Sequence, residues 1–410
     1  MAEKVLLVTV EFRNEKTWPL KDITDELEEL VVSCGGGVIE RVICKYDTPQ
    51  PRFLIGNGKV KDIAHICQTK AIDTVIVSHN LKGSQQRNLE EACGVKVIDR
   101  TQLILDIFAR RAKSMEGKMQ VELAQLDYLL PRLVGHGEEL SRLGGGIGTV
   151  GPGETKLETD RRRISARISK LKKDLKEVSL SRKTKRKKRQ EQHIPSVALV
   201  GYTNAGKSTL LNTLTKANQE AADALFTTLD PLSRQMDLAN HQRIILSDTV
   251  GFMHELPHNL IEAFKATLEE VTEADILLHV LDVSNPKFQN LHGAVMDVLK
   301  ELEVKDKPIV TVLNKIDRVE DKNWLAEVQR NFENAVCISA SQGENIQELM
   351  DKISEFVVST MTEIDVKIPL NRMDLVNLVH KEGRVHSVEY LADGIQIRAV
   401  VPFKVANKIQ

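Results

Sequence analysis

The chain has 410 residues, of which 41% are hydrophobic and 28% charged, and its formal net charge is −1. This composition excludes a disordered or fibrous protein, and the length predicts two to four domains of about 100–200 residues each. Aromatic residues make up only 4%, which argues against binding of single-stranded nucleic acid by rows of stacked aromatic rings. The sequence contains neither an apolar run long enough to span a bilayer nor a signal peptide, so we expect a soluble intracellular protein.

Positive charge is concentrated in one segment. Residues 161–189 contain 15 Lys and Arg against two acids, a local charge of +13, so the remainder of the chain carries −14. The near-neutral total therefore does not exclude a polyanionic partner. A solvated linker would have the same composition, but a phosphate backbone is the favoured partner of such a segment.

The first hundred residues alternate between strand-like and helix-like runs. We expect strands over residues 5–12, 38–46, 73–79 and 95–99, with amphipathic helices between them. This alternation implies crossover connections and predicts a small parallel α/β domain over residues 1–105.

Residues 106–192 follow a different pattern. We expect one long helix over 101–134 that ends near Pro131, a glycine-rich loop over 143–155, and a second helix over about 157–177. Two long helices joined by such a loop predict a projecting helical hairpin, after which the basic run 182–189 is interpreted as a linker.

A second alternation of strands and helices over residues 193–360 predicts another α/β domain. The last segment, 361–410, predicts a small α+β domain that contains a strand, a helix and a hairpin turning at Asp393 and Gly394.

A phosphate-loop pattern, GxxxxGK[ST], lies in VALVGYTNAGKST between a strand pattern and a helix pattern. Its glycines allow backbone N–H groups to converge on phosphate oxygens, Lys207 would contact the β- and γ-phosphates, and the Ser208 hydroxyl would bind Mg²⁺. Asn204 is either a turn residue or a ligand, through its side-chain carbonyl, of a monovalent cation. The loop residues expected to bind nucleotide are Gly201, Tyr202, Thr203, Asn204, Ala205, Gly206, Lys207, Ser208 and Thr209.

Two further segments are expected beside the phosphates. In DTVG, Asp248 is placed to hold Mg²⁺ through water, and Gly251 can present its N–H to the γ-phosphate. In FTTLD, Thr228 is the candidate for a second Mg²⁺ hydroxyl, with Thr227 as its rival. The catalytic candidates are thus Lys207, Thr228 and Gly251, and the two segments comprise Phe226, Thr227, Thr228, Leu229, Asp230, Asp248, Thr249, Val250 and Gly251.

The segment NKID points to the choice of base. A carboxylate such as Asp317 can accept both N1–H and N2–H₂ of guanine, whereas adenine would leave its charge unpaired. Asn314 would reach the base edge, the Lys315 stem would cover the ring, and SAS could add a backbone N–H to guanine O6. The residues are Asn314, Lys315, Ile316, Asp317, Ser339, Ala340 and Ser341.

These motifs, each after its own strand, predict a GTPase. Phe252 follows DTVG, where many GTPases place a glutamine that orients the attacking water. A phenyl ring cannot bond to that water, so intrinsic hydrolysis should be slow and need outside help. His254 could act as a base, although a solvated loop histidine is the favoured interpretation.

The segment GGIGTVGPGETKLETDRRRI, followed by these motifs, resembles the HflX family of translation-associated GTPases. The resemblance implies binding to the large ribosomal subunit, whose RNA stimulates GTP hydrolysis, and a glycine loop that reaches toward the peptidyl-transferase centre. It also implies splitting or rescue of stalled ribosomes under stress, and it fits potassium at Asn204 and a hydrophobic residue at Phe252. Ser341 departs from the family, which often has lysine there.

We therefore expect an α/β protein with a small parallel N-terminal domain and projecting helical hairpin, a central P-loop GTPase domain and a small C-terminal α+β domain. Ribosomal RNA would bind the hairpin and segment 161–189, with GTP as substrate, Mg²⁺ as cofactor and K⁺ as a further candidate. We expect a cytoplasmic monomer that associates peripherally with ribosomes or membranes.

Two alternatives remain at this point. One is an ATP-driven RNA remodeller with a second nucleotide site in the N-terminal domain, where GNGK at residues 56–59 is the nearest candidate but lacks the spacing of a phosphate loop. The other is a regulatory switch that uses GTP only to select a protein partner.

Overall fold

The structure is a computed structural model that describes ten segments of the chain and divides into two compact units. The first unit contains the described residues up to Glu177, and the second contains nearly all described residues from Val178 onwards. The segments comprise residues 2–14, 18–133, 152–191, 194–215, 232–238, 242–253, 265–304, 307–359, 361–391 and 393–409.

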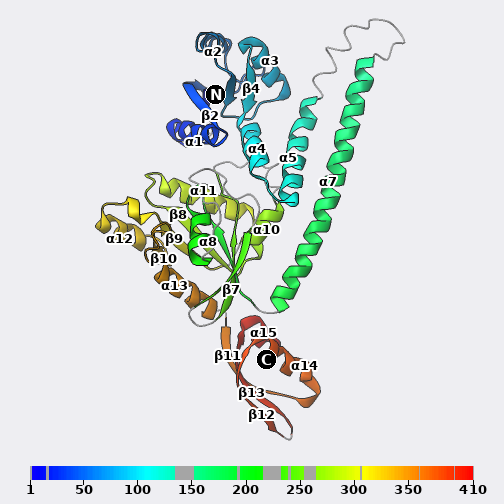
Figure 1. The fold of residues 1–410 in the computed structure, drawn as a ribbon, viewed down its shortest axis with the longest axis vertical. Helices are drawn as coiled ribbons and strands as arrows, with labels where there is room; N and C mark the ends of the chain where they lie inside the picture. Colours follow the sequence, from blue (N-terminus) through cyan, green and yellow to red (C-terminus); the bar gives the residue numbers. More distant parts are fainter. Residues whose placement is uncertain are drawn as a thin grey trace. The chain divides into compact units, whose positions relative to one another are not determined.

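The first unit contains a four-stranded parallel sheet in the order β2-β1-β3-β4 (Figure 1). The central β1 is buried along nearly its whole apolar run, as expected for a strand of a parallel sheet that is covered on both faces. This confirms the small parallel α/β domain. Its elements are β1 (Glu3–Phe12), α1 (Leu20–Ser33), β2 (Gly36–Tyr46), α2 (Asn57–Thr69), β3 (Thr74–Val77), α3 (Gly83–Cys93) and β4 (Lys96–Asp99).

The single long helix expected over 101–134 is wrong. Two helices form instead, α4 (Arg100–Arg111) and α5 (Met115–Leu133). The chain turns out of the helix at Ala112, whose ψ is 108°, and the Ser114 hydroxyl accepts a hydrogen bond from the N–H of Gly117 at 2.8 Å. A serine that caps the first turn in this way favours a new helix start over a continuous helix. Helix α5 ends at Leu133, near Pro131 as expected, and Pro131 lies inside its last turn.

The second helix is longer than the expected range of about 157–177, because helix α7 runs from Pro152 to Glu191 and includes the basic run 182–189. Proline is favoured at the first position of a helix, and the lysines and arginines that fill the basic run are good helix formers. The whole +13 segment, residues 161–189, therefore lies on one helix.

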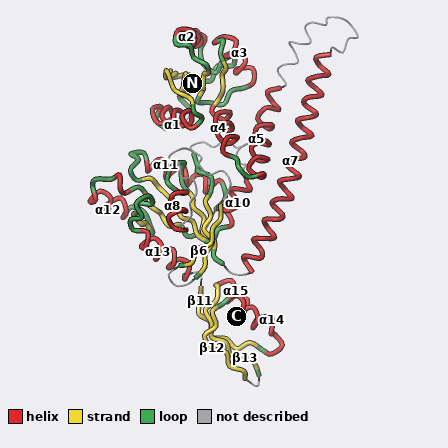
Figure 2. Tube along the Cα trace, viewed as in Figure 1, coloured by secondary structure: helices red, strands yellow, loops and turns green. Residues whose placement is uncertain are grey.

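Helices α5 and α7 pack against each other, as expected for the two arms of a hairpin (Figure 2). Leu123 of α5 forms a buried cluster with Ile168 and Leu171 of α7. Beside it, the Arg167 guanidinium donates two hydrogen bonds to the Glu122 carboxylate, at 2.6 and 2.7 Å. Most of the predicted glycine loop lies outside the described residues.

A six-stranded sheet forms the centre of the second unit, in the order β10-β9-β8-β5-β7-β6, with only β6 antiparallel to its neighbour. The elements are β5 (Ser196–Val200), α8 (Lys207–Thr215), β6 (Leu232–Asp237), β7 (Arg243–Asp248), α10 (Lys265–Glu273), β8 (Ile276–Asp282), α11 (Phe288–Glu301), β9 (Ile309–Asn314), η1 (Ile316–Arg318), α12 (Lys322–Arg330), β10 (Ala335–Cys337) and α13 (Ile346–Ser359).

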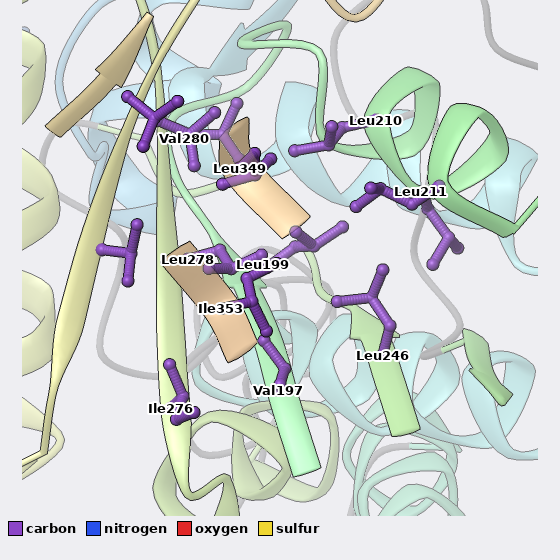
Figure 3. Close-up of a cluster of buried hydrophobic side chains, with 14 of the residues drawn as sticks. Val197, Leu199, Leu210, Leu211, Leu246, Ile276, Leu278, Val280, Leu349 and Ile353 are labelled. Atoms are coloured by element: carbon purple, nitrogen blue, oxygen red, sulfur yellow. The ribbon is translucent and has the colours of Figure 1, made fainter. Parts of the chain in front are cut away.

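One face of this sheet is packed by α8 and α13 (Figure 3). Leu199 and Leu278, on the neighbouring strands β5 and β8, lie in one buried cluster with Leu211 of α8 and Ile353 of α13. This packing fixes the carboxyl ends of β5, β7 and β9, where the motif residues follow.

The C-terminal segment forms a three-stranded antiparallel sheet in the order β11-β13-β12, which agrees with the expected small α+β domain. Gly394 pairs with Leu391 at the predicted hairpin, whereas the final helix was not anticipated. Among the residues that the structure describes, no helix combines the length and apolarity that a bilayer span requires. The elements are β11 (Met361–Ile368), η2 (Leu370–Arg372), α14 (Met373–Glu382), β12 (Arg384–Leu391), β13 (Gly394–Pro402) and α15 (Phe403–Ile409).

Candidate active site

The phosphate-loop sequence connects β5 to α8 and needs its two glycines for space as well as for backbone conformation. Gly201 has φ +154° and Gly206 has φ +96°, values that other residues rarely adopt. A Cβ on Gly201 would lie 2.3 Å from the carbonyl oxygen of Val280, and one on Gly206 would lie 2.3 Å from Nδ2 of Asn314. The loop is thus pressed against β8 and the NKID segment.

Lys207 is buried beneath this loop with 6% of its surface exposed. Its ammonium donates hydrogen bonds to the carbonyl oxygens of Gly201 at 3.0 Å and Tyr202 at 2.7 Å. Burial lowers the pKa of Lys207 to about 8, and the nearby Asp248 carboxylate opposes the shift only in part. An anionic phosphate would supply the negative charge that this buried cation lacks.

Ser208 and Asp248 form a buried pair of oxygen donors. The Ser208 hydroxyl donates to Oδ2 of Asp248 at 2.7 Å. The position of Asp248 is supported by its neighbour Thr249, whose hydroxyl donates to the carbonyl of Leu199 at 2.6 Å. A hydroxyl and a carboxylate side by side fit Mg²⁺, which prefers oxygen ligands and retains several waters.

The DTVG segment is paired directly with the phosphate loop. The N–H of Thr203 donates to the carbonyl of Phe252 at 2.9 Å, and the N–H of Phe252 donates to the carbonyl of Gly201 at 3.0 Å. A Cβ on Gly251 would lie 2.8 Å from the Cα of Thr203 and 3.2 Å from the Lys207 ammonium, so glycine is required there. Phe252 is 1% exposed, and its ring therefore belongs to the protein interior.

Asn314 joins the phosphate loop to the SAS segment. Its Nδ2 donates to the carbonyl of Ala205 at 2.8 Å, and its Oδ1 accepts from the N–H of Ala340 at 3.0 Å. We expected Asn314 to reach the base edge and the SAS backbone to contact guanine. In this geometry the Asn314 side chain and the Ala340 N–H are bonded to each other. Asn314 therefore holds the phosphate loop and the SAS segment in position.

Asp317 is exposed, and one of its oxygens is fixed by SAS. The Ser339 hydroxyl donates to Oδ1 of Asp317 at 2.5 Å, and Ser339 itself is fully buried. Ser339 and Ser341 place their hydroxyl oxygens 3.2 Å apart. The carboxylate expected to pair with guanine is thus oriented by a buried hydroxyl.

The remaining predicted site residues, Phe226, Thr227, Thr228, Leu229 and Asp230, lie outside the described residues, as does His254. Within the described part, the structure brings the GKS, DTVG, NKID and SAS segments together along one edge of the sheet, because β5, β7, β8, β9 and β10 are parallel.

Family models match four consecutive parts of the chain. Their descriptions are GTP-binding GTPase N-terminal over residues 21–109, GTP-binding GTPase Middle Region over 111–189, 50S ribosome-binding GTPase over 196–315 and HflX C-terminal domain over 325–405.

Curated relatives match along nearly the whole length. GTPase HflX of Lacrimispora saccharolytica is 45% identical over 98% of this chain and 94% of its own. GTPase HflX of Escherichia coli is 41% identical over 96% of this chain and 90% of its own. This chain belongs to the HflX family.

As a member of the HflX family the chain is an enzyme that hydrolyses GTP. Among solved structures, a GTP-binding protein from Sulfolobus solfataricus in complex with GDP is 27% identical, covers 88% of this chain and 99% of its own, and has a TM-score of 0.46.

GNGK, the second candidate phosphate loop, does not have that conformation. Gly56 has φ −72° and directly precedes α2, which begins at Asn57, and neither glycine of GNGK has a positive φ. The segment starts an ordinary helix.

Sequence reasoning missed two residues that support the SAS and NKID segments. The Thr213 hydroxyl donates to the carbonyl of Ala340 at 2.7 Å, which attaches SAS to α8. Asp282 ends β8 and forms an ion pair with Lys315. The signal for Asp282 was present, since it is an acid at the end of a buried strand, as Asp248 is.

Proposed function

We propose that this GTPase binds the large ribosomal subunit through α5 and α7, that the ribosome stimulates its GTP hydrolysis, and that it splits or rescues stalled ribosomes under stress. One observation carries the proposal: a continuous helix, α7, bears +13 over residues 161–189. Ile168 and Leu171 are buried against α5, while Arg161, Arg162 and Arg163 are exposed. A rod with one apolar side and an exposed cationic surface suits the phosphates of folded RNA.

The match of residues 196–315 to a family described as 50S ribosome-binding GTPase supports the same partner. With it we propose domain limits of 1–105, 106–192, 193–360 and 361–410, a monomer, and a cytoplasmic location. The sheets and helices described above fall largely within these limits, except that α4 crosses residue 105.

For the reaction we propose in-line attack by water on the γ-phosphate. Lys207 neutralises charge on the phosphate oxygens, and the Gly251 N–H contacts the γ-phosphate. Ser208, Asp248 and Thr228 would hold Mg²⁺, which supplies charge neutralisation when bound. We propose that the side-chain oxygen of Asn204 would bind K⁺, which would add to the neutralisation of charge on the phosphates; the backbone of Asn204 has φ +61°.

Base selection follows from Asp317. Its carboxylate accepts N1–H and N2–H₂ of guanine and is oriented by Ser339, while Asn314 holds the loops on both sides at a fixed separation. The other nucleotide-contacting residues are those predicted from the sequence.

The first test is GTP hydrolysis by the full chain with and without purified large ribosomal subunits, in KCl and in NaCl. We expect stimulation of about tenfold or more with subunits, a lower rate in NaCl, and no activity for Lys207→Ala. Equal rates with and without subunits would overturn ribosomal stimulation and favour a GTP-dependent protein-binding switch. Equal rates in the two salts would remove the role of K⁺.

The second test addresses α7. Replacing Arg161, Arg162 and Arg163 by glutamine should weaken subunit binding and reduce the slope of log affinity against log salt by about one for each lost phosphate contact. The matched control replaces Lys367, Arg372 and Arg398, which are exposed cations in ion pairs of the C-terminal domain. Equal losses in both variants would contradict binding through α7.

A further inference from the structure

A partly buried ion pair lies beside the base site and involves a residue outside the four motifs. Nζ of Lys315 is 2.7 Å from Oδ2 of Asp282, and the two side chains are only 14% and 15% exposed. Asp282 ends β8 and lies opposite Asn314 at the end of β9, so the pair bridges adjacent strand ends.

The Asp282 carboxylate is itself fixed. Its other oxygen, Oδ1, accepts hydrogen bonds from the backbone N–H of Ser284 at 3.0 Å and from the Ser284 hydroxyl at 2.6 Å. One oxygen thus anchors the carboxylate to the turn after β8, and the other is directed at Lys315. A carboxylate held in this way can define the position of a flexible lysine.

The backbone of Lys315 has φ +65° and ψ 35°. This left-handed conformation is unfavourable for a residue with a Cβ. It follows directly on Asn314, whose side chain turns inward to Ala205 and Ala340. The chain therefore reverses at Lys315, which directs its side chain to the end of β8, and the ion pair with Asp282 fixes the position of the ammonium there.

We propose that Asp282 is a positioning residue for nucleotide binding, which holds the Lys315 stem in the place where it covers the guanine ring. The inference rests on the proposed base site. It adds a specific consequence: Asp282 strengthens binding of any purine nucleotide, while Asp317 alone selects guanine. Contact between an aliphatic stem and a ring face does not depend on the ring substituents.

The experiment is a double-mutant cycle on release of a fluorescent GDP analogue by the full chain without ribosomes. Asp282→Asn should release the analogue about tenfold faster, because it removes a charge-assisted bond while keeping an acceptor for Ser284. Lys315→Met keeps an apolar stem and lacks the ammonium. If Asp282 acts through Lys315, adding Asp282→Asn to Lys315→Met should have no further effect.

Three outcomes would overturn the proposal: unchanged release for Asp282→Asn, additive effects in the cycle, or a change in the ratio of GDP to xanthosine diphosphate affinity. The control is Asp237→Asn, which removes an exposed ion pair with Arg243 in the same unit and should leave release unchanged. Thermal unfolding of each variant separates a folding defect from lost positioning. Since no ribosome is present, failure here leaves the ribosomal proposal standing, and failure of ribosomal stimulation leaves this one standing.

Discussion

Both α/β sheets of the molecule have a parallel strand that ends in a buried aspartate, yet the two aspartates have different partners. Asp248, at the end of β7, accepts from the Ser208 hydroxyl and lies near the Lys207 ammonium. Asp99, at the end of β4, forms an ion pair with the Arg132 guanidinium at 3.0 Å. A carboxylate that accepts only from a hydroxyl keeps its negative charge and can bind a cation, whereas a guanidinium neutralises that charge.

The surroundings of Asp99 complete the difference. Arg132 comes from α5 and also donates to the carbonyl of Leu81 at 2.7 Å, and its Cζ lies 3.4 Å from the centroid of the Tyr128 ring. The second oxygen of Asp99 accepts from the N–H of Gln102 and so caps α4. Helix α5 covers the carboxyl end of β4 in the N-terminal sheet, whereas the phosphate loop lies at the corresponding end of the GTPase sheet. The aspartate alone therefore does not indicate a nucleotide site. The neighbouring loop and the partner of the carboxylate distinguish such a site from a purely structural ion pair.

The largest expected effect concerns base choice at the GTPase edge. Asp317→Asn replaces the carboxylate that we propose as the acceptor of two guanine donors with a side chain that also donates, so preference for GTP over xanthosine triphosphate should fall by about 10³–10⁴-fold. Steady-state hydrolysis of both nucleotides measures this ratio. Glu320→Gln is the control, because it makes the same change from carboxylate to amide at a nearby exposed position and should retain the preference for GTP. A ratio unchanged by Asp317→Asn would mean that guanine is selected elsewhere.

The next largest effect concerns the ion pair of Asp99 and Arg132 at the end of β4 in the N-terminal sheet. Arg132→Ala leaves the Asp99 charge buried and unpaired, which should lower the free energy of unfolding of the N-terminal region by about 3 kcal/mol. The chain has two tryptophans, and in a Trp324→Phe background the fluorescence of Trp18 reports on this region during urea unfolding. Release of GDP should stay as in the parent chain. Faster release would show that the two regions are coupled, contrary to the separation of roles argued above.

The sequence suffices for the parallel sheets and the motif positions, because each motif follows its own apolar strand and parallel strands end at one edge. It did not reveal the direction of side chains. Asn314 turns inward to Ala205 although its motif predicts contact with the base, and the ion pair of Asp282 depends on a reversal at Lys315. The predicted helix limits were wrong at Ser114, where weak local preferences compete, and in α7, where the helix continues through the run of lysines and arginines.

The smallest effect is a pH dependence that only the GTPase edge should show. Burial lowers the pKa of Lys207 from 10.5 to about 8 in the nucleotide-free chain, and phosphates that bind the ammonium must raise it. Below pH 8 the lysine is already charged and GDP affinity should not depend on this group. Above pH 8 binding must take up a proton, so GDP affinity should fall, by up to about tenfold between pH 8 and 9.

The stability of the nucleotide-free chain should change with pH in the opposite direction. It should rise from pH 8 toward 10.5, because the unfolded chain binds more protons than the folded chain over this range. Titration calorimetry with GDP at pH 7, 8 and 9 tests the expected fall in GDP affinity, with Lys207→Arg as a permanently charged control. If the GDP affinity of the wild-type chain depends on pH as little as that of the control, burial does not lower the pKa of Lys207 to about 8.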